Sequence, residues 1–348
     1  MSVTKEIPVP VISRKLTRSW ELKKKAENLI PAVSQTFSKG PTQYVQGVAP
    51  VYLERGSGSH VWDVDGNEYI DYPMALGPII LGHNYPAVTD AVARQLSEGV
   101  AFSLPHPLEL EVAELLAETI PCAEMVRFGK NGSDVTAGAV RLARGFTGRD
   151  IVACCGYHGW QDWYVGTTSR NRGIPEAVRK LTKPFKYNDA ASLARIFDEH
   201  PGQVAAVIME PIGVVVPKNG FLEEVRELAT RHGALLIFDE VITGFRIAMG
   251  GAQEYFRVTP DLACFGKAMG NGFAISAMVG KREIMRLLSE VYFSFTFAGD
   301  PLSLAAAKAT INEMNRQSVI AHIWEQGTSL KDGFNTISKN CGLEERVY

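Results

Sequence analysis

The sequence predicts an α/β fold, with a mostly parallel central sheet covered by helices on both faces. From Met125 onward, strand-like and helix-like patterns alternate, as they do in parallel sheets. The apolar runs at 204–209 and 234–238 lack polar alternation, which is typical of strands buried on both faces. The chain has 348 residues, more than the roughly 250–300 that one core usually supports. We therefore expect a large domain and a smaller part.

The N-terminal part is expected to be a small region of its own. A helix is predicted near residues 19–28, and short strands are predicted at 51–53, 60–64 and 69–72. Asp65-Gly66-Asn67 is a hairpin turn signal, so these strands should form an antiparallel meander. The predicted division is an arm with the first small-domain strands at 1–60, a large domain at 61–310, and the start of a truncated C-terminal small domain at 311–348.

The large domain should contain its elements in the following order. Pro86 suits the first position of a helix, and Gly233 suits a helix end. Helices are expected from Pro86 and at 108–119, 133–144, 193–199, 221–232, 301–316 and 323–337. Strands are expected at 125–128, 151–154, 204–209, 234–238, 261–265 and 273–279. The segment 291–297 alternates in hydrophobicity and carries Thr296.

Composition excludes several functional classes. The formal net charge is -2, so neither a nucleic acid nor a membrane surface is an expected partner. No apolar run approaches the ~20 residues of a membrane-spanning helix. The five cysteines show no metal-type spacing, and no metal site is expected. We interpret the cysteines as reduced thiols, which is typical of a cytoplasmic protein.

An acid and a lysine follow two of the predicted strands. Asp239 ends the apolar run at 234–238, and Lys267 comes after the run at 261–265. Ligands of open α/β sheets bind beyond the carboxyl ends of the strands. A lysine there loses its proton readily, because desolvation disfavours the ammonium form, and a neutral amine can form a Schiff base. Taken alone, the acid could equally begin a loop, and the lysine could lie in a surface turn.

Other strand ends supply further parts of a cofactor site. Gly132 and Ser133 lie between a strand and a helix, where Ser133 could cap the helix or help to bind a phosphate. Tyr157 could stack on a planar cofactor, while His158 is either a base or a histidine held by backbone groups. Neither a Walker loop nor G-x-G-x-x-G occurs. Together these parts predict a pyridoxal phosphate (PLP) imine on Lys267, with Asp239 on the ring nitrogen.

Several motifs then resemble the class III aminotransferases of PLP fold type I, most closely the glutamate-1-semialdehyde 2,1-aminomutase branch. The matching stretches appear in family order and cover most of residues 50–310. They are WDVDGNEYIDY, GPIILGHNYP, MVRFGKNGSDVTAGAVRLARGFTGRD, GYHG, MEPI, FDEVITGFRIAMGGAQEYFRVTPDLACFGKAMGNG and FTFAGDPLS.

The resemblance implies roles for individual residues. It implies that Lys267 is the catalytic imine lysine, that Asp239 binds the ring nitrogen, and that Gly132 and Ser133 bind the phosphate. It further implies that Val241 packs on the ring face opposite Tyr157 and that Glu210 is an acid beside the cofactor. Thr296 matches a threonine that reaches the phosphate in the neighbouring subunit, which implies a homodimer.

The expected function is amino transfer from a small-molecule amino donor to an aldehyde or ketone acceptor. The branch carries an N-terminal arginine for its substrate's carboxylate, but residues 40–50 here contain none, which favours a neutral or sugar-like acceptor. Leu76 replaces an aromatic residue of that branch. The alternatives are a 2,1-aminomutase with the same site, and a PLP-binding homologue or subunit without turnover.

Overall fold

The computed structural model describes residues 14–344 and 347. Within them the chain forms two compact units, residues 14–76 with 82–84, and residues 77–81 with 85–344 and 347, which we describe separately. The three-part division at residues 60 and 310 stays a prediction. No helix in the described ranges has both the length and the apolar character needed to cross a membrane.

The first unit is built on a three-stranded antiparallel sheet. Its strands are β1 (Leu53–Ser57), β2 (His60–Asp63) and β3 (Glu68–Ile70), paired in that order. The carboxylate of Asp63 accepts hydrogen bonds from Asn67 N at 2.8 Å and Tyr69 Oη at 2.8 Å, which fixes the turn between β2 and β3. The predicted meander is therefore confirmed. The unit's helices are α1 (Thr17–Ala26), η1 (Pro31–Val33), η2 (Phe37–Lys39), η3 (Pro41–Gln43) and η4 (Met74–Leu76).

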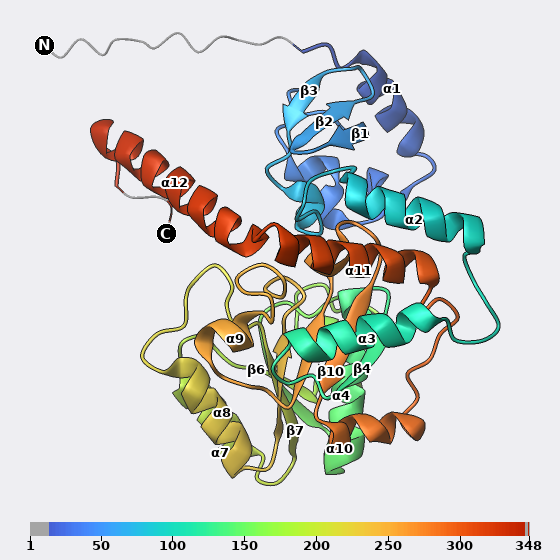
Figure 1. Cartoon of the computed structure of the whole chain (residues 1–348). Helices are drawn as coiled ribbons and strands as arrows, with labels where there is room; N and C mark the ends of the chain where they lie inside the picture. The colour runs from blue at the N-terminus through green and yellow to red at the C-terminus, as the bar shows by residue number, and fades with distance from the viewer. Residues whose placement is uncertain (1–13, 345–346, 348) are drawn as a thin grey trace, which may run out of the picture. The chain divides into compact units, whose positions relative to one another are not determined.

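The second unit contains the predicted central sheet, with seven strands in the order β4-β10-β9-β8-β7-β5-β6 (Figure 1). The strands are β4 (Met125–Gly129), β5 (Ile151–Cys155), β6 (Thr182–Pro184), β7 (Val204–Met209), β8 (Leu235–Asp239), β9 (Leu262–Phe265) and β10 (Ser276–Gly280). Only β10 runs against its neighbours, so the sheet is mostly parallel, as predicted. The short strand β6 was not predicted.

Helices cover both faces of this sheet. The longer helices of the unit are α2 (Pro86–Glu98), α3 (Pro107–Thr119), α4 (Gly132–Thr147), α7 (Ala190–Glu199), α8 (Phe221–Arg231), α11 (Pro301–Arg316) and α12 (Val319–Asn340). The shorter ones are α5 (Asp162–Val165), α6 (Glu176–Arg179), α9 (Ala252–Phe256), η5 (Lys267–Gly270), α10 (Arg282–Met285) and η6 (Arg286–Ser289). Of these, α3, α7, α8 and α11 lie on one face of the sheet, and α4 and α10 lie on the other. In Figure 1, α2 and α11 run beside each other, and they pack together.

Successive residues of the central strands face opposite layers of the core. In β8, Leu236 and Phe238 pack with residues of α3, α8 and α11, whereas Leu235 and Ile237 pack with residues of α4 and α10. All four side chains are buried. This explains the unbroken apolar run, because a strand with helices on both sides has no face for polar residues. In contrast, the alternating segment 291–297 forms no strand and leads irregularly into α11.

Candidate active site

The predicted site residues gather at one edge of the central sheet. Because β4, β5, β7, β8 and β9 all point the same way, their carboxyl ends meet at that edge. Gly132 follows β4, Tyr157 follows β5, Glu210 follows β7, Asp239 ends β8, and Lys267 follows β9.

Asp239 is held in one orientation by two donors. It is buried, one carboxylate oxygen lies 2.8 Å from His158 Nδ1, and the other accepts the Val241 N–H at 3.1 Å. His158 is also buried and stacks on Trp163, with ring centroids 5.9 Å apart. The expectation that backbone groups hold His158 is therefore wrong, since its polar contact is the Asp239 carboxylate. A carboxylate fixed in this way can bind a protonated ring nitrogen.

The loop before α4 forms a tight cradle at the helix N-terminus. The helix begins at Gly132 with Asn131 as its N-cap, so Ser133 is not the cap. Ser133 Oγ instead accepts the Trp160 N–H at 3.0 Å. A Cβ at Gly159 would lie 2.4 Å from Ser133 Oγ and 2.6 Å from its Cβ, so only glycine fits there. The Asp134 N–H donates to Asn131 O at 3.0 Å, and the Gly132 and Ser133 N–H groups at the start of α4 are suited to bind a phosphate.

Val241 joins this cradle to the segment that carries the lysine. A Cβ at Gly132 would lie 2.8 Å from Val241 Cγ1, and one at Gly266 would lie 3.5 Å from the same atom. Val241 therefore lies between the phosphate loop and the residue that precedes Lys267. This contact brings together three parts of the predicted site that are far apart in sequence.

Tyr157 presents its ring to solvent at the same edge. Its side chain is 62% exposed, although the backbone is fixed, because Glu210 Oε2 accepts the Tyr157 N–H at 2.8 Å. Tyr164 packs edge-on against the ring, with centroids 5.7 Å apart. One face of a held tyrosine ring can therefore receive a flat ligand. Burial raises the pKa of Glu210 above its ordinary value, and the nearby Asp239 charge raises it further.

Lys267 lies half-buried at the start of η5, directly after β9. Its φ of 36° is in the left-handed region that non-glycine residues rarely adopt, and such strain is often found at functional sites. Burial lowers the pKa of its amine, the positive charge of Arg246 lowers it further, and the carboxylates of Asp239 and Glu210 oppose both effects. The result favours the neutral amine, which is the nucleophilic form.

Thr296 is not brought to this group within a single chain. It is exposed, in the irregular segment before α11. That segment is anchored elsewhere: Arg127 donates to Phe293 O at 2.9 Å, and Arg141 donates to Tyr292 O at 2.6 Å. A role for Thr296 would therefore be in another subunit's site.

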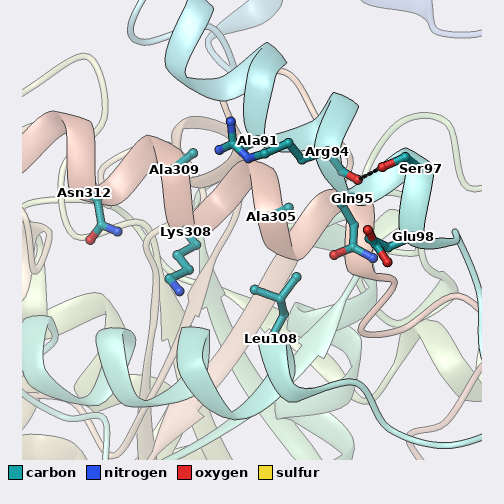
Figure 2. Close-up of a pocket in the computed structure, with 10 residues that line it drawn as sticks. All are labelled: Ala91, Arg94, Gln95, Ser97, Glu98, Leu108, Ala305, Lys308, Ala309 and Asn312. Carbon is teal, nitrogen blue, oxygen red and sulfur yellow. Dashed lines mark hydrogen bonds between the residues drawn. The ribbon is translucent and has the colours of Figure 1, made fainter.

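A separate cavity of about 550 Å³ lies between α2, α11 and the start of α3 (Figure 2). None of its lining residues is a predicted site residue, and none follows a strand of the central sheet. The lining residues are Ala91, Arg94, Gln95, Ser97, Glu98, Leu108, Ala305, Lys308, Ala309 and Asn312. The candidate active site is the open edge of the sheet and not this cavity.

Two residues near Lys267 were not predicted to belong to the site. Arg246 donates through Nη2 to Gly77 O, and Asn271 Oδ1 accepts the N–H groups of residues 80 and 81 at 2.9 Å. They hold the 77–81 segment against the lysine side of the site. The GFR and GNG stretches that carry them show no chemical pattern, so sequence alone could not identify them.

The comparisons with known proteins agree on one family. The sequence pattern described as aminotransferase class-III matches residues 43–345. The 3-aminobutyryl-CoA aminotransferase of Cloacimonas acidaminovorans (strain Evry) is 43% identical over 337 residues, covering 94% of this chain and 80% of that protein. The glutamate-1-semialdehyde 2,1-aminomutase of Alkaliphilus oremlandii (strain OhILAs) is 41% identical over 342 residues, covering 91% and 80%.

A solved structure gives the same result for the fold. The PLP internal aldimine form of the FumI protein of Sphingopyxis sp. MTA144 superposes with a TM-score of 0.88 at 30% identity. The match covers 94% of this chain and 80% of that one. The predicted PLP fold type I is therefore confirmed.

Proposed function

The chain belongs to the class III aminotransferase family, and on that premise we propose that Lys267 and Asp239 hold its pyridoxal phosphate during amino transfer. The observation that carries this assignment is the set of contacts at the sheet edge. Val241 touches the positions of Gly132 and Gly266, and Asp239 contacts His158. These residues come from four separate βα connections. Loops that only join a strand to a helix need not bring such residues into contact.

The residues at this edge fit PLP in shape and charge. The tight cradle at Gly132 and Gly159, which a Cβ would fill, matches a group that approaches the backbone closely. When bound, PLP supplies an electron sink for the substrate carbon that carries the amino group. Ser133 and the α4 N-terminus would hold the phosphate, and Asp239 would keep the proton on the ring nitrogen.

Four side chains have further distinct tasks in this proposal. Tyr157 and Val241 would contact the cofactor ring and limit its movement. Lys267, whose pKa is lowered by burial, would bond the cofactor and later take the proton from the substrate carbon. Glu210, through its bond to the Tyr157 N–H, would keep the aromatic ring in place.

We favour amino transfer between two molecules over a 2,1-aminomutase reaction. Residues 40–50 contain no lysine or arginine, so no cation from that segment is available for a substrate carboxylate. A relative of 43% identity acts on 3-aminobutyryl-CoA, in which the acyl carboxyl is masked as a thioester. Both points support a substrate that is uncharged near its amino group.

The two reactions can be separated with the PLP-loaded protein. We expect it to transfer the amino group of 3-aminobutyryl-CoA to a 2-oxo acid, with formation of the matching amino acid. Glutamate 1-semialdehyde should give no amino-shifted isomer when no other amino compound is present. Isomerisation of that single substrate would contradict the proposal, and absence of turnover with every donor would favour the non-catalytic alternative.

We also propose a homodimer in the cytoplasm. Apolar side chains are exposed at Phe102 (53%), Leu104 (79%) and Phe297 (62%), and a Cβ at Gly299 would touch Glu109 of α3. Gly299 thus lies beside α3, which follows residues 102–104, and a second copy could cover these exposed side chains while Thr296 reaches its site. Light scattering should give twice the chain mass, and Leu104→Glu should lower it. The cytoplasmic location is supported by five unpaired cysteines.

A further inference from the structure

Arg246 carries a positive charge beside Lys267 that no carboxylate neutralises. Within the described residues, no aspartate or glutamate lies within ion-pair distance of its guanidinium. Its partners are two backbone carbonyls: Nε donates to Ile242 O at 2.9 Å, and Nη2 donates to Gly77 O. Burying a cation without a carboxylate partner costs free energy, so the presence of an arginine at position 246 needs a physical explanation.

The position of Gly77 relates Arg246 to the lysine. A Cβ at Gly77 would lie 3.5 Å from Arg246 Nη2 and 3.7 Å from Lys267 Cδ. The two cationic side chains therefore lie against the same glycine, whose φ is 94°. Asn271 Oδ1 accepts the N–H groups of residues 80 and 81. The segment 77–81 beside Lys267 is therefore fixed at both ends.

We propose that Arg246 is a positioning residue for Lys267, which fixes the Gly77 backbone over the lysine side chain and keeps an unneutralised positive charge beside its amine. Two of its donor groups are occupied by carbonyl oxygens, which suits a fixed clamp better than a carboxylate receptor. The proposal depends on the proposed function only in taking Lys267 as the cofactor lysine.

The charges around the amine agree with this role. Asp239 and Glu210 favour the ammonium form, while burial and Arg246 favour the neutral amine and lower the pKa of Lys267. Asp239 is partly offset by its contact with His158. Without Arg246, burial would remain but its positive charge would no longer oppose the two carboxylates, and the amine would hold its proton to higher pH.

The test measures the pH dependence of the Lys267 amine itself. The full chain, stripped of cofactor, is pulsed with acetic anhydride at a series of pH values, and acetylation of the Lys267 peptide is quantified by mass spectrometry. Only the neutral amine reacts. For Arg246→Met we expect the pH midpoint of Lys267 acetylation to rise. The acetylation rate near neutral pH should fall by about three- to tenfold.

Three other variants complete the test. Arg246→Lys keeps the charge and should retain a midpoint near that of the parent protein. Arg231→Met removes an exposed arginine and should change nothing. If Arg246→Met does not fold, Arg246→Gln removes the charge, keeps an amide donor and carries the same expectation.

Several results would overturn the proposal. One is a midpoint in Arg246→Met equal to that of the parent protein, and another is an equal shift in Arg246→Lys. A third is an unchanged midpoint with a higher KM confined to carboxylate-bearing substrates, which would make Arg246 a substrate receptor. Because the acetylation needs no cofactor, it stays informative even if PLP is found on a different lysine.

Discussion

Replacing Gly159 by alanine should damage the phosphate cradle more than the fold around it. The new Cβ would lie 2.4 Å from Ser133 Oγ and 2.9 Å from Ser133 Cα. A rotation of the serine side chain cannot relieve contact with its backbone, so the start of α4 must move. Gly159 also has a φ of 97°, which alanine adopts only with strain.

Gly173 provides a matched control. Its φ is 93°, but a Cβ there would meet nothing within 4 Å. Gly173→Ala should therefore lose about 1–2 kcal/mol from the left-handed backbone alone. Gly159→Ala should lose the same amount plus about 1–3 kcal/mol for the forced contact. Each kcal/mol lowers the Tm of a domain this large by roughly 2–4 °C.

Cofactor binding separates the two variants further. Moving Ser133 would remove the hydrogen-bond donor that we propose for the charged phosphate, which is worth about 1.5–3 kcal/mol, or roughly 10–100-fold in the Kd of PLP. Titration of the cofactor-free variants with PLP, followed by absorbance, measures this change. Equal losses of Tm and of PLP affinity in Gly159→Ala and Gly173→Ala would refute the role of the contact between Gly159 and Ser133.

Substitutions at three carboxylates, Asp239, Glu210 and Asp261, give further predictions. Asp239→Ala leaves His158 Nδ1 without its acceptor, so urea unfolding should show a loss of about 1–3 kcal/mol for that donor, and Asp239→Asn should lose less. Glu210 has a raised pKa from burial, so the native state holds its proton more tightly, and stability falls as pH rises from the ordinary value of 4.5 through the raised one. Glu210→Gln should remove this slope from Tm measured against pH, and an unchanged slope would assign it to another group. Burial alone would raise the pKa of Asp261, but the hydrogen bond from Lys281 and other donors lower it. Its stabilisation is therefore present above the ordinary value of 3.8 and is lost as pH falls through the lowered one, so Asp261→Asn should flatten acid unfolding.

The parts of the fold that sequence predicted best are those with one strong periodic signal. The strand at 204–209 and the helix at 301–316 have the predicted bounds, because apolar runs and helical stripes are local patterns. The segment 291–297 alternates like a strand but pairs with no strand, although β4 lies at the edge of the sheet and Arg127 of β4 donates to Phe293 O. Only Phe293 of this segment is buried, and it packs on Gly138 of α4, whereas Phe295 and Phe297 are exposed. The sequence alternation therefore did not report a buried face here.

The candidate site was predictable where chemistry depends on residue type and strand position. Asp239 and Lys267 stand at strand ends, which sequence indicates directly. The contact between His158 and Asp239 joins residues 81 positions apart and could not be predicted from spacing. Arg246 could not be predicted for a similar reason, because its hydrogen-bond acceptor is the backbone carbonyl of Gly77. Every residue has such a carbonyl, so the sequence does not indicate which one is used.

The most direct test of the central claim is to locate the lysine that bonds PLP. The PLP-loaded protein is reduced with borohydride, digested, and analysed by mass spectrometry for the peptide that gains the reduced cofactor. The structure predicts the added mass on Lys267, and no such mass in Lys267→Ala. Lys130 is the natural comparison, because it adjoins the phosphate cradle and its pKa is also lowered by burial. A cofactor adduct on Lys130, or one that persists in Lys267→Ala, would contradict the account.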